Sequence, residues 1–312
     1  MDLSIVIVNW NTRDYLAQCL QSLQQTAGVV DPIAHTLAFG PYLTEVFVVD
    51  NASHDDSVTM VRDQFPWARL IKNDQNAGFA PANNQALRQS TGRYALLLNS
   101  DTEVKPDALR LLVEFMEQNP KAGAVGAHLF NGDGTLQPSC QPMLTPWREF
   151  WRLTFLDQIV RRSTYDMARW NARDPQRVDV IKGACLLVRR TALDRIGLLD
   201  EQYFMYTEEV DLCYRLLHDG WTLHWLPTAH VVHYGEASSK QMAERMYVQL
   251  YRSKAQFYRK FGGEPRARQF IKLVRAAYWP RFIAASLLRP FRPQIAAQQQ
   301  IFRHLLDDLA TM

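Results

Sequence analysis

Apolar and polar positions alternate along the chain in blocks of two kinds. Short apolar runs, bounded by polar residues and turn signals, occupy 3–8, 45–49 and 94–98. Runs of this length predict strands that are buried on both faces of a parallel sheet. Stretches with helical spacing follow at 12–25, 57–65 and 107–118, with Thr12 placed to cap the first. The alternation predicts an α/β fold with a doubly wound, mostly parallel sheet.

Other segments depart from this alternation. Residues 28–44 include two prolines and two glycines, which predicts an irregular connection. Residues 137–176 mix prolines and tryptophans with arginines and lose any period, which predicts a long functional loop over the active-site face. Short apolar runs at 222–226 and 230–233 predict two edge strands. From residue 239 onwards the chain is expected to be helical and basic.

Composition narrows the class of protein. The chain is 47% hydrophobic and 21% charged, as in a globular protein. Its first residues predict a strand rather than a secretory signal, and the apolar runs are too short to span a bilayer. The four cysteines include no CxxC pair, which argues against a zinc site or a disulfide framework. We therefore expect a cytoplasmic protein.

Charge is distributed unevenly along the chain. Residues 1–239 hold 21 Lys and Arg against 28 Asp and Glu, whereas residues 240–312 hold 14 against 4. A basic C-terminal segment on an acidic body predicts an anionic partner, such as lipid headgroups or nucleic acid. The basic segment comes with no nucleic-acid-binding motif, so nucleic acid is not expected as the partner.

Glycine positions exclude two common nucleotide-binding folds. The first glycine is Gly28, so the G-x-G-x-x-G that a dinucleotide fold needs after its first strand is absent, and so is a G-K-[ST] loop. Polar side chains instead follow the expected strands, where ligands of open α/β sheets bind. They are Asn9, Asn11, Asp50, Asn51, Asn99, Ser100 and Asp101.

Asp50 and Asp101 each have two interpretations. Both carboxylates would lie at one edge if their strands are close in the sheet, with Asp50 on a ribose or base and Asp101 on a metal that binds phosphates. Alternatively, each carboxylate caps a helix, Asp101 that after Pro106. His230 and His233 both follow Pro227 in a predicted strand. A histidine in a strand is more often a core residue than a ligand, but at a strand end either one would be a second metal ligand beside Asp101.

Three carboxylates are expected in the first turn of a helix beginning at Glu208. The helix dipole alone favours anions there. Arg215 lies four residues after Asp211, so an ion pair is expected to hold Asp211 on the helix. Glu208 or Glu209 is then left as a general base at an apolar rim.

Taken in order, the polar motifs resemble those of the inverting glycosyltransferases of family 2, in their rhamnosyltransferase-like branch. The resemblance covers about residues 3–262. The motifs are Val8-Asn-Trp-Asn11, Val48-Val-Asp-Asn-Ala-Ser53, Asn76-Ala-Gly-Phe79 with Asn83-Asn84, Leu98-Asn-Ser-Asp-Thr102, Gly183-Ala184, Glu208-Glu-Val-Asp-Leu-Cys213 and Val232-His-Tyr-Gly235.

The resemblance implies a GT-A fold with a long acceptor-side loop region and a C-terminal helical extension. It implies a catalytic domain at 1–238, with a nucleotide-sugar half at about 1–130 and an acceptor half at about 131–238, and an extension at 239–312. It also implies Mg²⁺ or Mn²⁺ as cofactor, held by Asp101 and His233, and Glu209 as the base, with Glu208 as its rival.

The remaining site residues also follow from the resemblance. The donor side is assigned to Asn9, Asn11, Asp50, Asn51, Asn76, Gly78, Asn83, Asn99, Ser100 and Asp101, and the acceptor side to Lys182, Gly183, Asp211 and Arg215. Expected partners are a nucleotide-diphosphate sugar, with dTDP-rhamnose favoured, and a glycan or lipid-linked acceptor of bacterial surface polysaccharide synthesis. The alternative is a catalytically degenerate module that binds a nucleotide sugar or a glycan.

The C-terminal segment has two interpretations. Residues 268–278 place apolar side chains at helical spacing among basic ones, as in a helix that lies on the inner face of the cell membrane. The alternative is a helix that packs on the catalytic domain or on a second copy of the chain in an oligomer.

Overall fold

The computed structural model describes residues 1–159, 163–235, 243–289 and 292–312. Two compact units divide the chain. The sheet unit comprises Met1–Gln141, Met167–Phe204 and Glu208–Ser238, and the helical unit comprises Pro142–Asp166, Met205–Thr207 and Ser239–Met312. The expected domain boundary at 238 and 239 lies outside the described residues.

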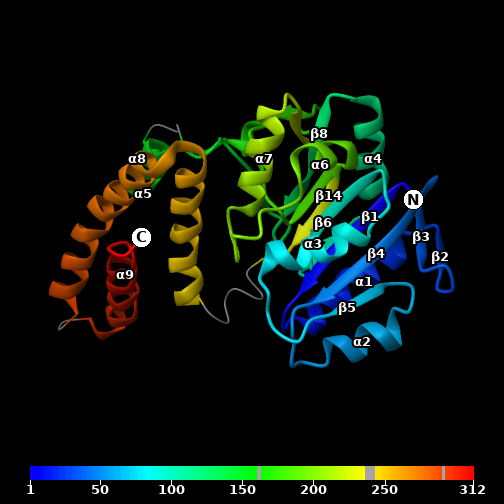
Figure 1. The fold of residues 1–312 in the computed structure, drawn as a ribbon, viewed down its shortest axis with the longest axis horizontal. Helices are drawn as coiled ribbons and strands as arrows, with labels where there is room; N and C mark the ends of the chain where they lie inside the picture. Colours follow the sequence, from blue (N-terminus) through cyan, green and yellow to red (C-terminus); the bar gives the residue numbers. More distant parts are fainter. Residues whose placement is uncertain (160–162, 236–242, 290–291) are drawn as a thin grey trace. The chain divides into compact units, whose positions relative to one another are not determined.

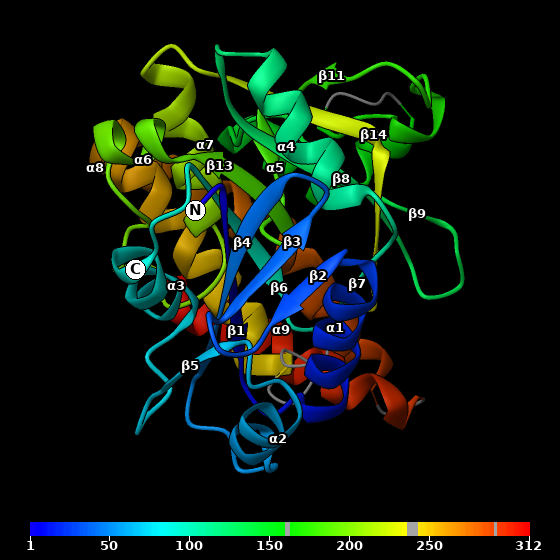
Figure 2. The same ribbon diagram turned by 90° about the vertical axis from the view of Figure 1, so that its right-hand side faces the viewer.

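The centre of the sheet unit is four parallel strands in the order β5-β4-β1-β6. They are β1 (Leu3–Asn9), β4 (Tyr42–Asp50), β5 (Arg69–Lys72) and β6 (Tyr94–Asn99). Three of them are the apolar runs of the sequence, and Figures 1 and 2 show these three side by side. The expected buried parallel core is confirmed.

The sheet continues beyond β6 with mixed strand directions. Strand β13 (Cys185–Arg189) runs antiparallel between β6 and β8 (Ala122–Phe130), and β14 (Thr222–His233) is parallel to β8. Short strands at the margins are β7 (Thr102–Val104), β9 (Leu136–Gln137) and β11 (Gln176–Arg177), and β10 (Cys140–Gln141) pairs with β12 (Val180–Ile181).

Three expectations about local structure were wrong. Residues 28–44 contain a hairpin, β2 (Val29–Asp31) and β3 (Thr36–Phe39), that extends the sheet beyond β4. The two expected edge strands are one strand, β14, whose register shifts between Leu226 and His230. The region 137–176 contains α5 (Pro146–Leu153) and the short helices η1 (Leu156–Gln158) and η2 (Met167–Arg169).

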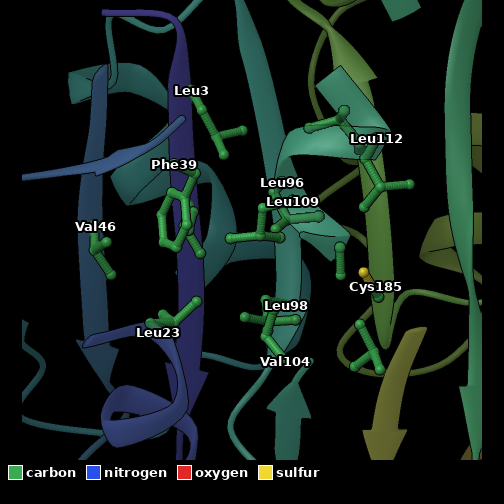
Figure 3. Packing of buried hydrophobic residues seen from close by; sticks show 14 of the residues in the cluster. Leu3, Leu23, Phe39, Val46, Leu96, Leu98, Val104, Leu109, Leu112 and Cys185 are labelled. Atoms are coloured by element: carbon green, nitrogen blue, oxygen red, sulfur yellow. The ribbon is translucent and has the colours of Figure 1, made fainter. Parts of the chain in front are cut away.

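Helices cover both faces of the sheet. One face packs on α1 (Arg13–Thr26), α2 (Ser57–Gln64) and α4 (Ala108–Gln118), which share one hydrophobic cluster with alternate residues of β1, β4 and β6. Figure 3 shows part of this cluster, with Leu3, Val46 and Leu96 from the strands. The sheet unit also contains α3 (Phe79–Gln89), α6 (Arg190–Ile196) and α7 (Glu208–His218), and α3 contacts β1 and β4.

The helical unit is built from α5, α8 (Ala243–Leu288) and α9 (Ala296–Asp308), with η4 (Pro293–Ile295) before α9. Helix α8 is kinked at Gly263, where the backbone leaves helical geometry (φ +70°), and Figure 1 shows its two arms. A buried ion pair from Lys254 Nζ to Glu149 Oε2 (2.6 Å) joins α8 to α5. Arg152 Nη2 also lies 2.7 Å from Glu149 Oε2, so the buried carboxylate is paired with two cations.

The apolar side chains of 268–278 form the core of the helical unit. Phe270 lies against Tyr258, with ring centroids 4.8 Å apart, and Tyr278 contacts Phe302 of α9 at 5.5 Å. The Tyr251 and Tyr278 hydroxyls are hydrogen-bonded at 2.7 Å. The expectation that this apolar face lies on a membrane was therefore wrong, because the unit's own helices cover it. In the part of the chain that the structure describes, no helix combines the length and apolarity needed to cross a bilayer.

Candidate active site

The carboxyl ends of β1, β4 and β6 meet at one edge of the sheet. Asn9 lies opposite Asp50 in the register of β1 with β4, and Val8 lies opposite Asn99 in that of β1 with β6. Strand β1 therefore stands between the two groups of polar residues that were expected to bind the donor. The structure brings Asn9, Asp50 and Asn99 to one edge, because the strands that carry them are neighbours in the sheet.

Asn9 is buried, and its side chain is fully used in holding this edge together. Its Nδ2 donates to Asp50 Oδ1 (3.0 Å) and to Ser53 Oγ (3.1 Å), and its Oδ1 accepts from Thr12 Oγ1 (2.7 Å). Thr12 was expected to cap α1, but its hydroxyl bonds Asn9 instead and lies 3.0 Å from Ser100 Oγ. The buried Asn9 side chain thus holds Asp50, Ser53 and Thr12 in place.

Asp50 and Asn11 shape the turn that follows β4. Asp50 is buried and accepts the Ser53 backbone N–H at Oδ2 (3.0 Å). Asn11, in the left-handed region at φ +52°, accepts the His54 N–H (2.8 Å) at its side chain. Neither residue caps a helix, because α2 begins at Ser57 after Asp56.

Asn51 anchors the loop that precedes α3. Its Nδ2 donates to Asn76 Oδ1 (2.9 Å) and to the Gly78 carbonyl (3.1 Å), and its Oδ1 accepts from Asn73 Nδ2 (3.0 Å). Asn83, one helical turn further on, is buried and donates to the Phe79 carbonyl (2.8 Å). The predicted donor residues of this loop are thus held by the end of β4.

Asp101 and His233 come together because two strands pair. Strand β7 is antiparallel to β14, with Thr102 opposite His233. His233 Nε2 lies 3.2 Å from Asp101 Oδ1 and 3.2 Å from Asn99 Nδ2. Strand β7 separates Asp101 from α4, so the helix-cap interpretation of Asp101 was wrong.

The Asp101–His233 pair fits a divalent cation that also binds a diphosphate. A carboxylate and an imidazole are ligands that Mn²⁺ accepts, and Mg²⁺ is commonly bound by one or two carboxylates together with substrate phosphates and water. Among the described residues, no group of three His, Cys, Asp or Glu could hold a metal ion. The protein side of such a site would therefore be small, with the remaining positions left for substrate oxygens.

Glu208 and Glu209 begin α7 in different environments. Glu208 is buried, and its burial, followed by the charge of Glu209, raises its pKa well above the usual range. Glu209 is half-buried and faces Gly183, where an added Cβ would lie 3.8 Å from the Glu209 Cβ. Burial lowers the pKa of Lys182, and the charge of Glu209 opposes that shift.

Gly183 links the two parts of the candidate site. Its neighbour Ala184 accepts the Asn99 backbone N–H (3.0 Å), so the segment beside Glu209 is attached to the end of β6. Of the residues assigned to the acceptor side, Lys182 and Gly183 lie next to Glu209. Their role in acceptor binding stays a prediction.

Asp211 and Arg215 form the expected ion pair. Arg215 Nε donates to Asp211 Oδ1 at 2.6 Å, and Asp211 is buried. Arg215 also donates to the carbonyls of Ile196, Gly197 and Leu198. This pair ties α7 to the end of α6.

Three residues of this edge were missed in the sequence. Thr12, Ser53 and Gln137 complete hydrogen bonds of Asn9 and His233. Ser53 is the last residue of the motif Val48-Val-Asp-Asn-Ala-Ser53, so the sequence did indicate that it belongs to the site. Gln137 lies where the sequence pattern is lost and had no local signal.

The fold and the motifs together define a glycosyltransferase. The model of the family described as Glycosyl transferase family 2 matches residues 4–197, and the chain belongs to this family. The chain is 28% identical over 233 residues to the N-acetylglucosaminyl-diphospho-decaprenol L-rhamnosyltransferase of Mycobacterium tuberculosis, covering 66% of this chain and 76% of the relative. It is 26% identical over 182 residues to the rhamnosyltransferase WbbL of Escherichia coli K12, covering 54% and 66%.

A solved structure shares the fold. The mannosyltransferase PcManGT from Pyrobaculum calidifontis, in complex with GDP-Man and Mn²⁺, superposes with a TM-score of 0.54 at 16% identity, covering 99% of this chain and 86% of that one. The GT-A fold expected from the sequence is confirmed, and so is the resemblance to rhamnosyltransferases of family 2.

Proposed function

We propose that this glycosyltransferase moves L-rhamnose from dTDP-rhamnose to a hydroxyl of a glycan or lipid-linked acceptor, with inversion at the anomeric carbon. The observation that carries the proposal is the Asp101–His233 pair, with Asp101 Oδ1 3.2 Å from His233 Nε2 beside the ends of the parallel strands. The rhamnosyltransferase names of two relatives support the choice of sugar. Synthesis of a bacterial surface polysaccharide is the proposed setting.

Asp101 and His233 would hold the Mg²⁺ or Mn²⁺ ion. When bound, the ion supplies Lewis-acid stabilisation of the negative charge that the departing diphosphate gains. The neighbouring Asn99 amide and Ser100 hydroxyl offer further polar groups at the same strand end. The donor is then oriented by the strand ends and by the loop that Asn51 anchors.

Glu209 is the proposed general base. It accepts the acceptor hydroxyl proton as that oxygen bonds to the anomeric carbon, while the bond from the carbon to the diphosphate oxygen breaks and the nucleoside diphosphate leaves. Glu208 is less suited, because the raised pKa of its buried carboxyl keeps it protonated. A base must be unprotonated before it can take a proton.

A lipid-linked acceptor places the enzyme at the inner face of the cell membrane. One relative is named for a diphospho-decaprenol substrate. The helical unit carries exposed apolar side chains on α8, Trp279, Ile283 and Leu287, with basic residues in the same segment. An apolar stripe with basic neighbours suits the interface of an anionic bilayer.

The test measures thermal stability with nucleotide diphosphates and nucleotide sugars, each with and without Mn²⁺. A ligand present at 100 times its Kd stabilises the folded state by about 2.7 kcal/mol, which raises Tm by several degrees. We expect dTDP and dTDP-rhamnose to raise Tm only with Mn²⁺, and the shift to disappear in Asp101→Asn. If UDP raised Tm and dTDP did not, the proposed donor would be a UDP-sugar and not dTDP-rhamnose.

Turnover separates the enzyme from a degenerate binding module. Glu209→Gln is expected to keep the donor-induced Tm shift and to lose transfer by about 10²–10⁴-fold, the usual contribution of a general base. Glu208→Gln, its matched neighbour, should retain most of its activity. Donor binding without turnover in the wild type would favour the binding module. If Glu208→Gln lost transfer and Glu209→Gln kept it, the base would be Glu208.

A further inference from the structure

The two ring nitrogens of His233 have different neighbours. Nδ1 lies 2.6 Å from Gln137 Oε1, whereas Nε2 lies 3.2 Å from Asp101 Oδ1 and 3.2 Å from Asn99 Nδ2. Neutral imidazole carries one hydrogen, and the neighbour of one nitrogen decides where it resides. Two acceptors, the Gln137 amide oxygen and the Asp101 carboxylate, compete for that hydrogen from opposite sides of the ring.

The orientation of the Gln137 amide decides this competition. Its Nε2 donates to the His233 main-chain carbonyl (2.9 Å) and to Asn131 Oδ1 (2.8 Å). A carbonyl oxygen can only accept, so the amide NH₂ must face it and Oε1 must face the ring. Nδ1 therefore carries the hydrogen, and the lone pair of Nε2 points toward Asp101 and Asn99.

A tight turn places Gln137 beneath the histidine. The Asn131 backbone N–H donates to the Thr135 carbonyl (2.8 Å) and the Gly134 N–H to the Asn131 carbonyl (2.9 Å). Strand β9 returns along β8 with Gln137 opposite Leu129. The Asn131 side chain donates to Thr135 Oγ1 (2.9 Å) across the turn and accepts from Gln137 Nε2, which leaves the Gln137 amide little freedom to rotate.

We propose that Gln137 is a positioning residue that holds His233 as the Nδ1–H tautomer, so that Nε2 and the Asp101 carboxylate together present a ligand pair to a divalent cation. The proposal rests on the metal role of Asp101 and His233 given above. Without Gln137, the nearby carboxylate would draw the hydrogen to Nε2 and occupy the lone pair that a metal needs. Hydrogen-bond partners of ligating histidines commonly have this effect on metal affinity.

The tautomer is measured in metal-free protein, with no donor or acceptor present. Long-range ¹H–¹⁵N correlation spectra of histidine-labelled protein at about pH 8, where an ordinary imidazole is neutral, distinguish Nδ1–H from Nε2–H. The wild type and Gln137→Glu, which keeps an oxygen acceptor opposite Nδ1, should show Nδ1–H. Gln137→Leu should shift His233 to Nε2–H, and Gln118→Leu, on the exposed last residue of α4, serves as the control.

Mn²⁺ titration calorimetry then measures the consequence. Gln137→Leu is expected to weaken Mn²⁺ binding by about 10–100-fold, with Gln137→Glu and Gln118→Leu much closer to the wild type and His233→Ala setting the lower limit. An Nε2–H tautomer in the wild type, or an unchanged tautomer and affinity in Gln137→Leu, would overturn the proposal. If the wild type binds no Mn²⁺ with or without dTDP, the metal role itself fails, and the tautomer spectra still decide the role of Gln137.

Discussion

At the scale of single residues, Glu208 is a carboxylic acid held almost entirely out of water. It is 6% exposed, and in the part of the chain that the structure describes its Oε2 is buried without a hydrogen-bond partner. Burial is the larger cause of its raised pKa, and the charge of Glu209 adds to it. Because a buried carboxyl is costly mainly when ionised, Glu208 stays protonated well above the pH at which an exposed glutamate releases its proton.

Glu208 therefore makes folding depend on pH. Its pKa is higher in the folded than in the unfolded state, so its contribution is fully present below about pH 4 and is lost as the pH rises toward the folded pKa, at up to about 1.4 kcal/mol per pH unit. In Glu208→Gln this loss is absent. Urea unfolding from pH 4 to pH 8 should show the variant gaining stability relative to the wild type as the pH rises. A constant difference across that range would contradict the buried acid.

Sequence spacing predicted some residue pairs and not others. The Asp211–Arg215 ion pair follows from one helical turn and was predicted from four-residue spacing. Asp101 and His233 are 132 positions apart, and their contact depends on the pairing of β7 with β14. In the sequence, only the strand-end position of the histidine and the family resemblance suggested that the two residues share a metal. Gln137 had neither local spacing nor a motif, so its contact with His233 needed the structure.

At the scale of elements, the loop before α3 depends on Gly78. Its backbone is in the left-handed region at φ +94°, and an added Cβ would lie 2.6 Å from the Phe204 carbonyl oxygen. Phe79 N–H donates to that same carbonyl (2.7 Å), so the loop and the 204 segment are held in contact. A side chain at this position would push the loop off its support and disturb the hydrogen bonds from Asn51.

Gly78→Ala and Gly134→Ala separate backbone strain from loss of space. Gly134 has a similar φ of +82° with nothing within 4 Å of an added Cβ, so alanine there should cost about 1 kcal/mol of unfolding free energy. Gly78→Ala should cost about 1–3 kcal/mol more, because the overlap is with backbone, and should weaken dTDP binding. Urea unfolding and nucleotide titration of both variants give the comparison. Equal costs would show that the loop moves freely.

Two element predictions failed for physical reasons. Val29–Asp31 is short and partly exposed, so it lacks the apolar run by which the buried strands were found. The apolar runs 222–226 and 230–233, which predicted two strands, lie on either side of Pro227, and proline cannot donate to a ladder. In the structure the proline lies within β14, where the register with β8 shifts between Leu226 and His230, and the strand continues beside β8. Buried parallel strands were predictable from the sequence, whereas margins and bulges were not.

At the scale of the whole molecule, the uneven charge coincides with uneven exposure of large apolar side chains. The segment 240–312 holds 14 basic against 4 acidic residues. Along the second arm of α8, Trp279, Ile283 and Leu287 recur every four residues and are 45%, 51% and 68% exposed. The opposite side of the same arm, with Tyr278, belongs to the core of the helical unit. The helix thus has two apolar sides, and one of them is uncovered.

Lys272, Arg289 and Arg292 are exposed basic residues of the same unit. Each basic residue near an anionic surface adds about 1 kcal/mol of attraction, and apolar side chains that enter the interface add to it. We therefore expect the protein to sediment with phosphatidylglycerol-containing vesicles at low salt and to sediment less at 0.5 M NaCl. Vesicles of phosphatidylcholine alone should bind it weakly.

Replacing Trp279, Ile283 and Leu287 with serine should lower vesicle binding at least about tenfold, because three apolar side chains leave the interface while the charge is unchanged. Ile33→Ser is the matched control, since Ile33 is 91% exposed on the turn between β2 and β3 in the sheet unit. That variant should bind like the wild type. If the triple variant also binds like the wild type, attraction resides in the basic residues alone. If the wild type does not bind anionic vesicles, the exposed apolar side of α8 is not a lipid-binding surface. A lipid-linked acceptor would then have to bind without help from this side of α8.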